Sequence, residues 1–361
     1  MSPTESIVSF FTETHDGLRV VLAVVLCMLA AKTGFQALRF HLAAPRSEIA
    51  WASIACLAFG LGIWSTHFSA MLGYRPDLVL GFTQTSIAAS FAVALIGIGP
   101  AIVVGARQTS ARGRLIWASI AAAATGLMHN IGVLGLTDCA PALGPIETVL
   151  GVALAAGMFA IALKAVRYTT GGNVLAALAL TLGVGALHFV SVAGMTLEAL
   201  DEAAAAAAAG ARVENGVIAA AVAGIALIIG AMLLVAHGQR VNGRLEGIAR
   251  ASQDGMLVIG ARGAAEWANP AFQRLTGLCL KGRAKTDPLR ALAALHGDEE
   301  VAEAMRAGLV EGRRVEAVVR IDAADGPRWL ELTLNPVRGA GGARDGAALA
   351  LHDVTETRHR E

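Results

Sequence analysis

The segment that decides the fold class runs from Ile49 to Leu72 and reads IAWASIACLAFGLGIWSTHFSAML. It contains no Asp, Glu, Lys or Arg, and its one histidine is His67. At about 1.5 Å per residue, a helix of this length crosses the hydrocarbon core of a bilayer, which is about 30 Å thick. Backbone groups in lipid find no water to bond, so the segment is predicted to be a transmembrane helix.

Six further segments have the same character, and with the first they predict an all-α bundle of seven transmembrane helices. Apolar residues make up 55% of the 361 residues, charged residues make up 16%, and the mean hydropathy is +0.59. Soluble domains carry about 25% charged residues, so the ordinary soluble and disordered classes are excluded. The net charge of +1 gives no electrostatic reason to expect a nucleic-acid partner. The six segments are Leu18–Leu38, Leu80–Val104, Leu115–Leu136, Pro145–Val166, Val174–Leu197 and Val217–Ala236.

Basic residues concentrate in the loops on one side of this bundle, and they set its orientation. By the positive-inside rule that side is cytoplasmic. The outer N-terminal segment is then residues 1–17, the membrane domain is residues 18–236, and the rest of the chain is cytoplasmic. The basic residues on this side are Arg39, Arg46, Arg107, Arg112, Arg114, Lys164, Arg167, Arg240 and Arg244.

Every second span carries a histidine near its outer end, at His67, His129 and His188. The spacings of 62 and 59 residues indicate a two-helix unit that is repeated three times. At about 1.5 Å per residue the histidines lie roughly 8–14 Å below the outer surface, so they share one level of the bilayer. Ionisable side chains in a bilayer face the bundle interior, and we expect the three rings to converge there.

A metal site is the main hypothesis for these histidines, because imidazole binds zinc, copper, iron and nickel. Met71 and Met195 follow the first and third histidines by four and seven residues, which places each on its histidine's helix stripe. Met128 directly precedes the second histidine. Thioether and imidazole together favour copper, while zinc or no metal stays open. The structural alternative is that the histidines bond neighbouring helices and the methionines fill gaps in the packing.

The character of the sequence changes after about His237. Residues 237–252 are predicted to form a linker helix, and residues 253–361 an α+β domain with an antiparallel sheet, because glycine-bounded segments alternate with period two. No function is predicted for the alanine run Ala203–Ala209, which precedes the last span. The expected strands are Gly255–Ile259, Arg313–Asp322, Arg328–Val337 and Ala347–Val354, and the expected helices are Asn269–Thr276 and Asp287–Gly308.

At its three histidines the sequence resembles the MHYT family of bacterial integral membrane sensor domains, over roughly residues 10–240. The family is named for a Met-His-Tyr-Thr tetrapeptide on alternate helices, usually followed by Gly or Ala and Met. Here all three histidines are present, but the preceding Met survives only as Met128 and the following Met only as Met71. Met195 matches a further Met that trails the third copy. The resemblance implies a bacterial inner-membrane sensor that binds a metal, copper, near its outer face and responds to O2, CO, NO or another diatomic.

The region from Arg244 to His359 resembles a PAS domain. Asn269 precedes Pro270, so it is expected to cap the helix that follows. PAS domains and their leading helices commonly pair, which implies a homodimer through the linker helix and this domain; its ligand is left open. The motifs that carry the resemblance are DGMLVI at 254–259, NPAF at 269–272, LTG at 275–277, WLEL at 329–332 and HDVTE at 352–356.

Together these features predict a membrane sensor whose own chain is not an enzyme. No diguanylate cyclase or histidine kinase motif is found in the sequence. Output is therefore expected from a separate protein, or from a cyclase or kinase domain that this chain lacks. The alternatives are a haem-binding or redox membrane protein, a metal or proton transporter, and an anchor that only positions the PAS domain.

Overall fold

The computed structural model describes residues 14–43, 48–74, 81–137, 139–168, 172–200, 212–278, 287–323, 326–338 and 344–358. The run Ala203–Ala209 lies outside these residues. The chain divides into two compact units, Met1–Gly238 and Gln239–Glu361. Each unit is described by itself below.

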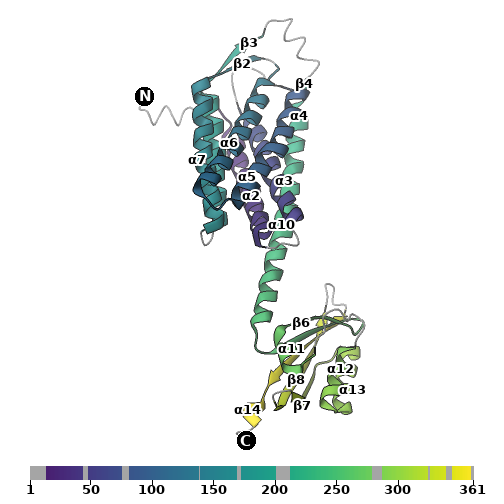
Figure 1. The fold of residues 1–361 in the computed structure, drawn as a ribbon. Helices are drawn as coiled ribbons and strands as arrows, with labels where there is room; N and C mark the ends of the chain where they lie inside the picture. The colour runs from purple at the N-terminus through teal and green to yellow at the C-terminus, as the bar shows by residue number, and fades with distance from the viewer. Residues whose placement is uncertain are drawn as a thin grey trace. The chain divides into compact units, whose positions relative to one another are not determined.

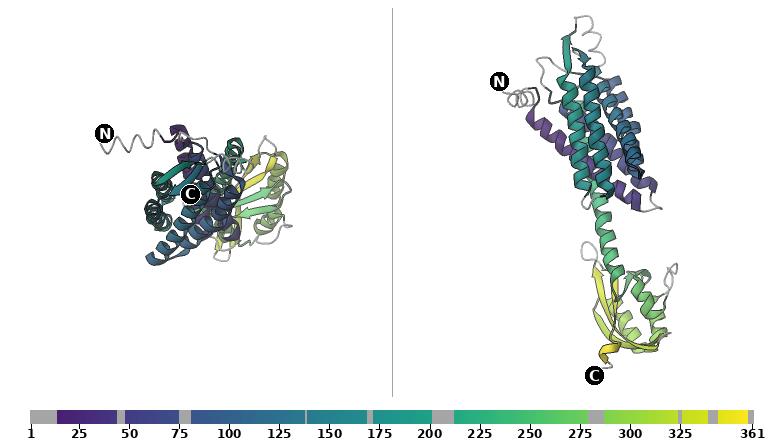
Figure 2. Two further views of the ribbon diagram at one scale, coloured as in Figure 1. Left: turned by 90° about the horizontal axis from the view of Figure 1, so that it is seen from above. Right: turned by 60° about the vertical axis from the view of Figure 1, so that its left-hand side comes forward.

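The first unit is a bundle in which the long helices lie side by side (Figures 1 and 2). Among the described residues, seven helical segments are long and apolar enough to cross a membrane, which confirms the predicted fold class. They are α2 (Gly17–Ala43), α3 (Glu48–Met71), the third span made of α4 (Gln84–Val93), η1 (Ala94–Ile98) and α5 (Gly99–Arg107), then α6 (Ala111–Leu134), α7 (Pro145–Tyr168), α8 (Gly172–Ala193) and α10 (Asn215–Ala251).

The third span departs from the expected uninterrupted helix, because residues Ala94–Ile98 form a π-helical turn, η1. Pro100 follows this turn, has no N–H to donate and crowds the carbonyl four residues before it, which explains the wide turn. Gly60 of α3 allows the close approach, since a Cβ there would lie 2.7 Å from the Ala94 carbonyl oxygen. The helical part begins at Gln84, later than predicted, where the Thr83 hydroxyl accepts a bond from Ser86 N–H.

Two small antiparallel pairs connect the loops at the end of the bundle where α8 ends and α10 begins (Figure 1). β1 (Phe82–Thr83) pairs with β4 (Arg212–Val213), and β2 (Cys139–Leu143) pairs with β3 (Met195–Ala199). The second pair corrects the prediction that the sixth span runs to Leu197. Helix α8 ends at Ala193, because the Gly194 carbonyl accepts Gly144 N–H at 3.0 Å and the chain continues as a strand.

The last span and the linker helix are one helix, α10, of 37 residues. The predicted linker helix at residues 237–252 is the last part of this helix, which continues the seventh span without a break. No proline interrupts the segment, and its glycines are tolerated inside a helix at a cost of about 1 kcal/mol each. An exposed ion pair between Glu246 and Arg250, one turn apart, supports its last part.

The second unit is an antiparallel sheet with helices, which confirms the α+β prediction. The order of its five strands is β6-β5-β9-β8-β7. The expected strands all occur within one to three residues of their predicted ends, but β6 was not predicted. The elements are β5 (Gly255–Gly260), β6 (Ala265–Ala268), β7 (Val315–Ala323), β8 (Gly326–Arg338), β9 (Arg344–Asp353), α11 (Pro270–Thr276), α12 (Pro288–His296), α13 (Glu299–Glu311) and α14 (Thr355–Arg358).

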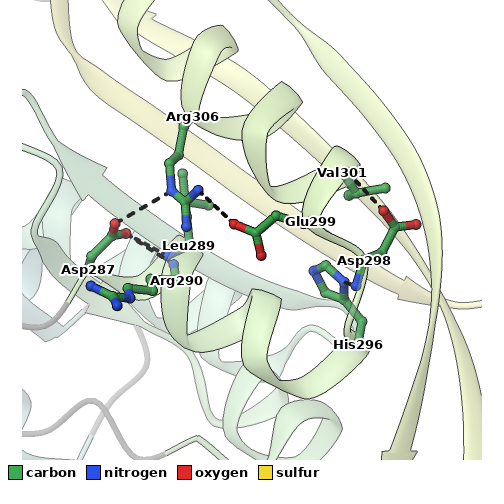
Figure 3. A network of polar contacts seen from close by, with 8 residues as sticks. All are labelled: Asp287, Leu289, Arg290, His296, Asp298, Glu299, Val301 and Arg306. Atoms are coloured by element: carbon green, nitrogen blue, oxygen red, sulfur yellow. Dashed lines mark hydrogen bonds and ion pairs between the residues drawn. The ribbon is translucent and has the colours of Figure 1, made fainter.

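The expected helix Asp287–Gly308 is two helices, α12 and α13. Gly297 adopts a left-handed φ of 67° and ends α12, and the Asp298 carboxylate then accepts Val301 N–H to begin α13 (Figure 3). Asp287 caps α12 in the same way and also pairs with Arg306 of α13 at 3.8 Å. The caps therefore fix the break that hydrophobic periodicity alone did not reveal.

Candidate metal centre

Three helices place the predicted histidines in one cluster. His67 on α3, His129 on α6 and His188 on α8 are 3%, 1% and 5% exposed. Their ring centroids are 4.8 Å (67 to 129), 5.2 Å (129 to 188) and 5.7 Å (67 to 188) apart. One nitrogen from each ring can be chosen so that all three lie within 4.8 Å of one another. The structure thus brings together the residues that the repeat places at one depth.

The ring separations fit a shared metal ion. Metal–nitrogen bonds of about 2.0 Å in tetrahedral geometry separate imidazole centroids by roughly 5 Å and ligand nitrogens by roughly 3.4 Å. The three centroid distances already lie near that value, whereas the nitrogens lie up to 4.8 Å apart. Small rotations of the rings, without helix movement, would therefore bring the ligand atoms to bonding distance.

The cluster has more hydrogen-bonding nitrogens than partners. His67 and His129 share one hydrogen bond between their Nδ1 atoms, at 3.1 Å. Among the described residues, no partner is found for Nε2 of either ring or for both nitrogens of His188. A buried polar atom without a partner costs about 1–3 kcal/mol, and buried polar groups are normally paired. Four such nitrogens in one cluster are the property expected of a ligand set rather than of helix packing.

A glycine makes room for one of the rings. A Cβ at Gly132 of α6 would lie 2.5 Å from His67 Nε2. The His67 ring can therefore occupy its place only because residue 132 has no side chain. This glycine follows His129 by three residues. A single turn of α6 therefore carries His129 and also makes room for the His67 ring.

The histidines line a cavity of about 40 Å³. A buried water needs roughly 10–15 Å³ by this measure, so the cavity has room for about three water-sized molecules. Its wall also contains Met128, the Cys27 thiol and the hydroxyls of Thr66, Thr125 and Thr181. The space suits an ion with one small ligand and is far below the several hundred Å³ of pockets that hold organic cofactors.

The three predicted methionines have different positions. Met128 lines the cavity beside the histidines. Met71 is buried at the end of α3 but does not line the cavity. Met195 corrects the prediction, because it pairs with Leu143 in the β2–β3 ladder and so shares no helix stripe with His188. Of the three thioethers, the structure places only that of Met128 on the cavity wall.

A fourth histidine was not predicted. His15 precedes α2, is 1% exposed and lies edge-on to the His188 ring with centroids 5.8 Å apart. It also contacts the rings of Tyr74 and Phe189, at 5.1 and 5.3 Å. Burial lowers the pKa of the His15 imidazole to about 4, so it is neutral at pH 7. The available signal was a histidine just before the first span, on the predicted outer side where the other three lie.

Comparisons with known families agree with both halves of this structure. The family described as a bacterial signalling protein N-terminal repeat, MHYT, matches residues 60–118, which include His67. The PAS fold matches residues 249–359. The resemblances inferred from the sequence are therefore confirmed for a signalling repeat in the membrane unit and a PAS domain in the second.

Two curated relatives are bacterial signalling proteins. An uncharacterized signaling protein of Caulobacter vibrioides is 27% identical over 201 residues, which cover 52% of this chain and 24% of that protein. The cyclic di-GMP phosphodiesterase NbdA of Pseudomonas aeruginosa is 28% identical over 202 residues, covering 51% of this chain and 25% of NbdA. The match thus spans about a quarter of each relative's length.

Solved structures with similarity to this chain include two Light-Oxygen-Voltage (LOV) proteins. An RNA-binding Light-Oxygen-Voltage receptor is 30% identical, with 33% of this chain and 35% of that chain covered and a TM-score of 0.29. The Rhodobacter sphaeroides LOV protein is 23% identical, with 34% and 72% covered and a TM-score of 0.28. The PAS assignment rests on the family match and on the five-stranded sheet.

These observations define a class: a multi-pass membrane protein of signal transduction, built from an MHYT repeat and a PAS domain. The families that match this chain are of the sensory kind.

Proposed function

We propose that the membrane unit is a sensor that binds one metal ion at His67, His129 and His188. The observation that carries this proposal is the set of four buried imidazole nitrogens without partners, in rings spaced near the value for a tetrahedral site. Bound metal would provide a partner for one nitrogen of each ring, and so for at most three of the four, as a Lewis acid held by neutral donors.

Copper is the metal we propose for this site. Three imidazoles and the Met128 thioether on one cavity wall form a soft donor set, which suits copper and particularly Cu(I). Copper(II) also stands highest in the affinity order of the divalent first-row metals for nitrogen sites. The donor set contains no carboxylate, so hard ions such as magnesium and calcium are disfavoured.

The signal we propose is a diatomic gas, O2, CO or NO, that enters the cavity beside the metal. With the three histidines as ligands and the Met128 thioether left unbound on the cavity wall, a tetrahedral ion has one position for an outside ligand. A cavity of about 40 Å³ accepts a diatomic but not a porphyrin, so its size speaks against the haem alternative. The hydroxyl of Thr181 and the thiol of Cys27 on the wall can donate hydrogen bonds to such a ligand, whereas the Thr66 hydroxyl already donates to the Gly62 carbonyl at 2.7 Å.

Transmission would run along α10, the helix that crosses from residue 215 to residue 251 and ends beside the PAS fold. A ligand changes output only by binding two helix arrangements with different affinity. We place the protein in a bacterial inner membrane, with its N-terminus outside and the PAS domain in the cytoplasm, as a homodimer through α10 and that domain. The NbdA relative supports an output partner or domain that acts on cyclic di-GMP.

Metal analysis of the purified protein tests the proposal. The variant changes His67, His129 and His188 together to Leu, which keeps the cavity apolar and filled. The matched control is His41→Leu, a buried histidine at the opposite end of α2. We expect about one copper per chain in the wild type and in the control, and none in the triple variant. Equal copper in the wild type and the triple variant would contradict the proposal.

A metal or proton transporter is the second candidate, and the π-helical turn η1 favours it, because transporters contain interrupted spans. None of its residues lines the histidine cavity, however. Copper or proton flux into proteoliposomes decides between the two. Flux that depends on His188 would show that the protein is a transporter and would contradict the sensor proposal. The absence of such flux would exclude the transporter and support the sensor proposal.

A further inference from the structure

His15 is held at the outer end of the histidine-bearing bundle by backbone bonds. It forms a β-bridge with Tyr74, and Asp16 N–H donates to the Gly73 carbonyl at 2.7 Å. Both partners follow α3, the helix of His67, by two or three residues. The segment before α2 is therefore fastened to the loop that follows one of the helices of the cluster.

The His15 ring stands to His188 as the other rings of the cluster do. Its centroid is 5.8 Å from that of His188, against 5.7 Å between His67 and His188. Its exposure of 1% equals that of His129. His15 thus matches the cluster in its burial and in its distance to His188, but it is not one of the three histidines whose nitrogens lie within 4.8 Å of one another, and it does not line the cavity.

The Nδ1 atom of His15 makes a hydrogen bond of the kind that orients metal-binding histidines. The Thr14 hydroxyl and His15 Nδ1 share a hydrogen bond of 2.9 Å. Ligating histidines usually bond a protein oxygen through one nitrogen, which fixes the ring while the other nitrogen binds the ion. With Nδ1 engaged in this way, Nε2 is the nitrogen that would ligate.

We propose that His15 is a fourth, exchangeable ligand of this metal, which it would reach from beside His188 by a shift of the segment before α2; this inference rests on the proposed function. Three ligands lie on membrane-crossing helices, whereas His15 lies on the short segment before α2. It is therefore the ligand that can leave while the three helices that carry the others keep their places. The exchange is a substitution in which the bond from Nε2 to the metal breaks and a bond from the metal to the diatomic forms, with no change of oxidation state.

Such an exchange would connect the site to the helix packing. Gly17, two residues after His15, begins α2, and α2 packs against α3 and α8, the helices of His67 and His188. A four-histidine site is closed, whereas a three-histidine site is open to a ligand. His15 would thus couple ligand binding to a displacement of the start of α2. The alternative is that the ring only fills space against Tyr74 and Phe189.

Copper(II) titration followed by electron paramagnetic resonance separates these roles in the full chain. His15→Phe keeps an aromatic ring against Tyr74 and Phe189 but has no ligand atom, and His41→Phe is the matched control. We expect one bound copper in all three proteins, nitrogen hyperfine structure from four imidazoles in the wild type and the control, and from three in His15→Phe. Azide, used as a probe of the open position, should bind His15→Phe at least tenfold more tightly than the wild type.

A second variant, His15→Ala, distinguishes the loss of a ligand nitrogen from a loss of side-chain packing. In His15→Ala, added imidazole should restore the four-nitrogen spectrum, because the cavity left by the side chain accepts the free ring. Identical spectra and azide affinities in the wild type and His15→Phe would overturn the role of His15 while leaving the three-histidine site intact. Absence of bound copper from the wild type would instead overturn the proposed function itself.

Discussion

The two units of this protein bury polar side chains in opposite ways. In the PAS domain, Asn269 is fully buried and makes four hydrogen bonds: its Oδ1 accepts Met256 N–H and Phe272 N–H, and its Nδ2 donates to the carbonyls of Ala249 and Asp254. In the membrane unit, His188 is nearly as buried, and neither ring nitrogen has a hydrogen-bond partner among the described residues.

This difference distinguishes a buried polar residue that stabilises the fold, Asn269, from one that is available to bind a ligand, His188. A buried amide with all its hydrogen bonds made fixes the positions of β5, α11 and the end of α10 around it. It has no hydrogen-bonding capacity left with which to bind a ligand. Imidazoles without partners reduce the stability of the fold, and under the function proposed above a bound metal offsets this cost. The predictions below test whether the two sites respond to change in these opposite ways, from the largest expected effect to the smallest.

Loss of the satisfied site should be the most costly. Asn269→Ala leaves two buried N–H groups unpaired and removes the cap of α11, so the PAS domain should lose about 3 kcal/mol of stability. Hydrogen-exchange mass spectrometry of the full chain measures this loss in peptides of β5 and β9. Asn335→Ala, at an exposed position of β8, is the control and should change exchange little. If hydrogen-exchange protection were unchanged in Asn269→Ala, the hydrogen bonds of Asn269 would not stabilise the PAS domain. The proposed difference between the two units would then be wrong.

A methyl group should disturb the histidine site through one ring. Gly132→Ala places a Cβ about where His67 Nε2 now lies, so the ring must move out of its seat. Copper affinity, measured by competition with a chelator, should fall about tenfold or more, as for changes that displace a metal ligand. Gly157→Ala in α7 is the control, because a Cβ there meets no atom within 4 Å. Equal affinities of the two variants would show that His67 does not ligate.

Removal of an unpartnered histidine should stabilise the metal-free protein. His188→Leu removes two buried nitrogens, each costing about 1–3 kcal/mol, and loses ring contacts worth about 1 kcal/mol. The balance is a gain of at least about 1 kcal/mol, which thermal unfolding in the presence of a chelator measures. A lower melting temperature for the metal-free variant than for the metal-free wild type would mean that His188 is a structural residue.

The smallest effect is expected at an exposed pair in the PAS domain. The hydrogen bond that His352 Nδ1 donates to the Asp254 carboxylate, at 2.7 Å, raises the pKa of His352 above its ordinary value. Since this pKa is raised in the fold, the pair stabilises the domain below the ordinary pKa of about 6.5, and the contribution is lost as pH rises through the folded value. Both side chains are well exposed, which keeps the contribution below about 1 kcal/mol.

Histidine NMR titration of Asp254→Asn tests this pair. The pKa of His352 should fall towards its ordinary value in the variant. A pKa that stays raised would assign the shift to Glu331 or Asp353, the other nearby carboxylates.

The parts of this structure that the sequence predicts are those with a local period. Hydropathy identifies the seven spans, and the repeat of His67, His129 and His188 places them at one depth. Met195 was misplaced because its strand depends on pairing with residues 139–143, which hydropathy does not register. His15 was missed for a similar reason, since its contact with His188 joins residues that are 173 positions apart. The π-helical turn was missed although Pro100, which explains it, is visible in the sequence; the close approach of this turn to Gly60 is a contact between spans.

The central claim is that buried histidines form a metal site in the outer half of the membrane unit. X-ray absorption at the copper edge tests it most directly, because it detects both Cu(I) and Cu(II) in the full chain in lipid nanodiscs. The account predicts scattering from three or four imidazole rings with nitrogen at about 2.0 Å, lost when His67, His129 and His188 are replaced by Leu. A shell without imidazole scattering, or one unchanged in the triple variant, would contradict it.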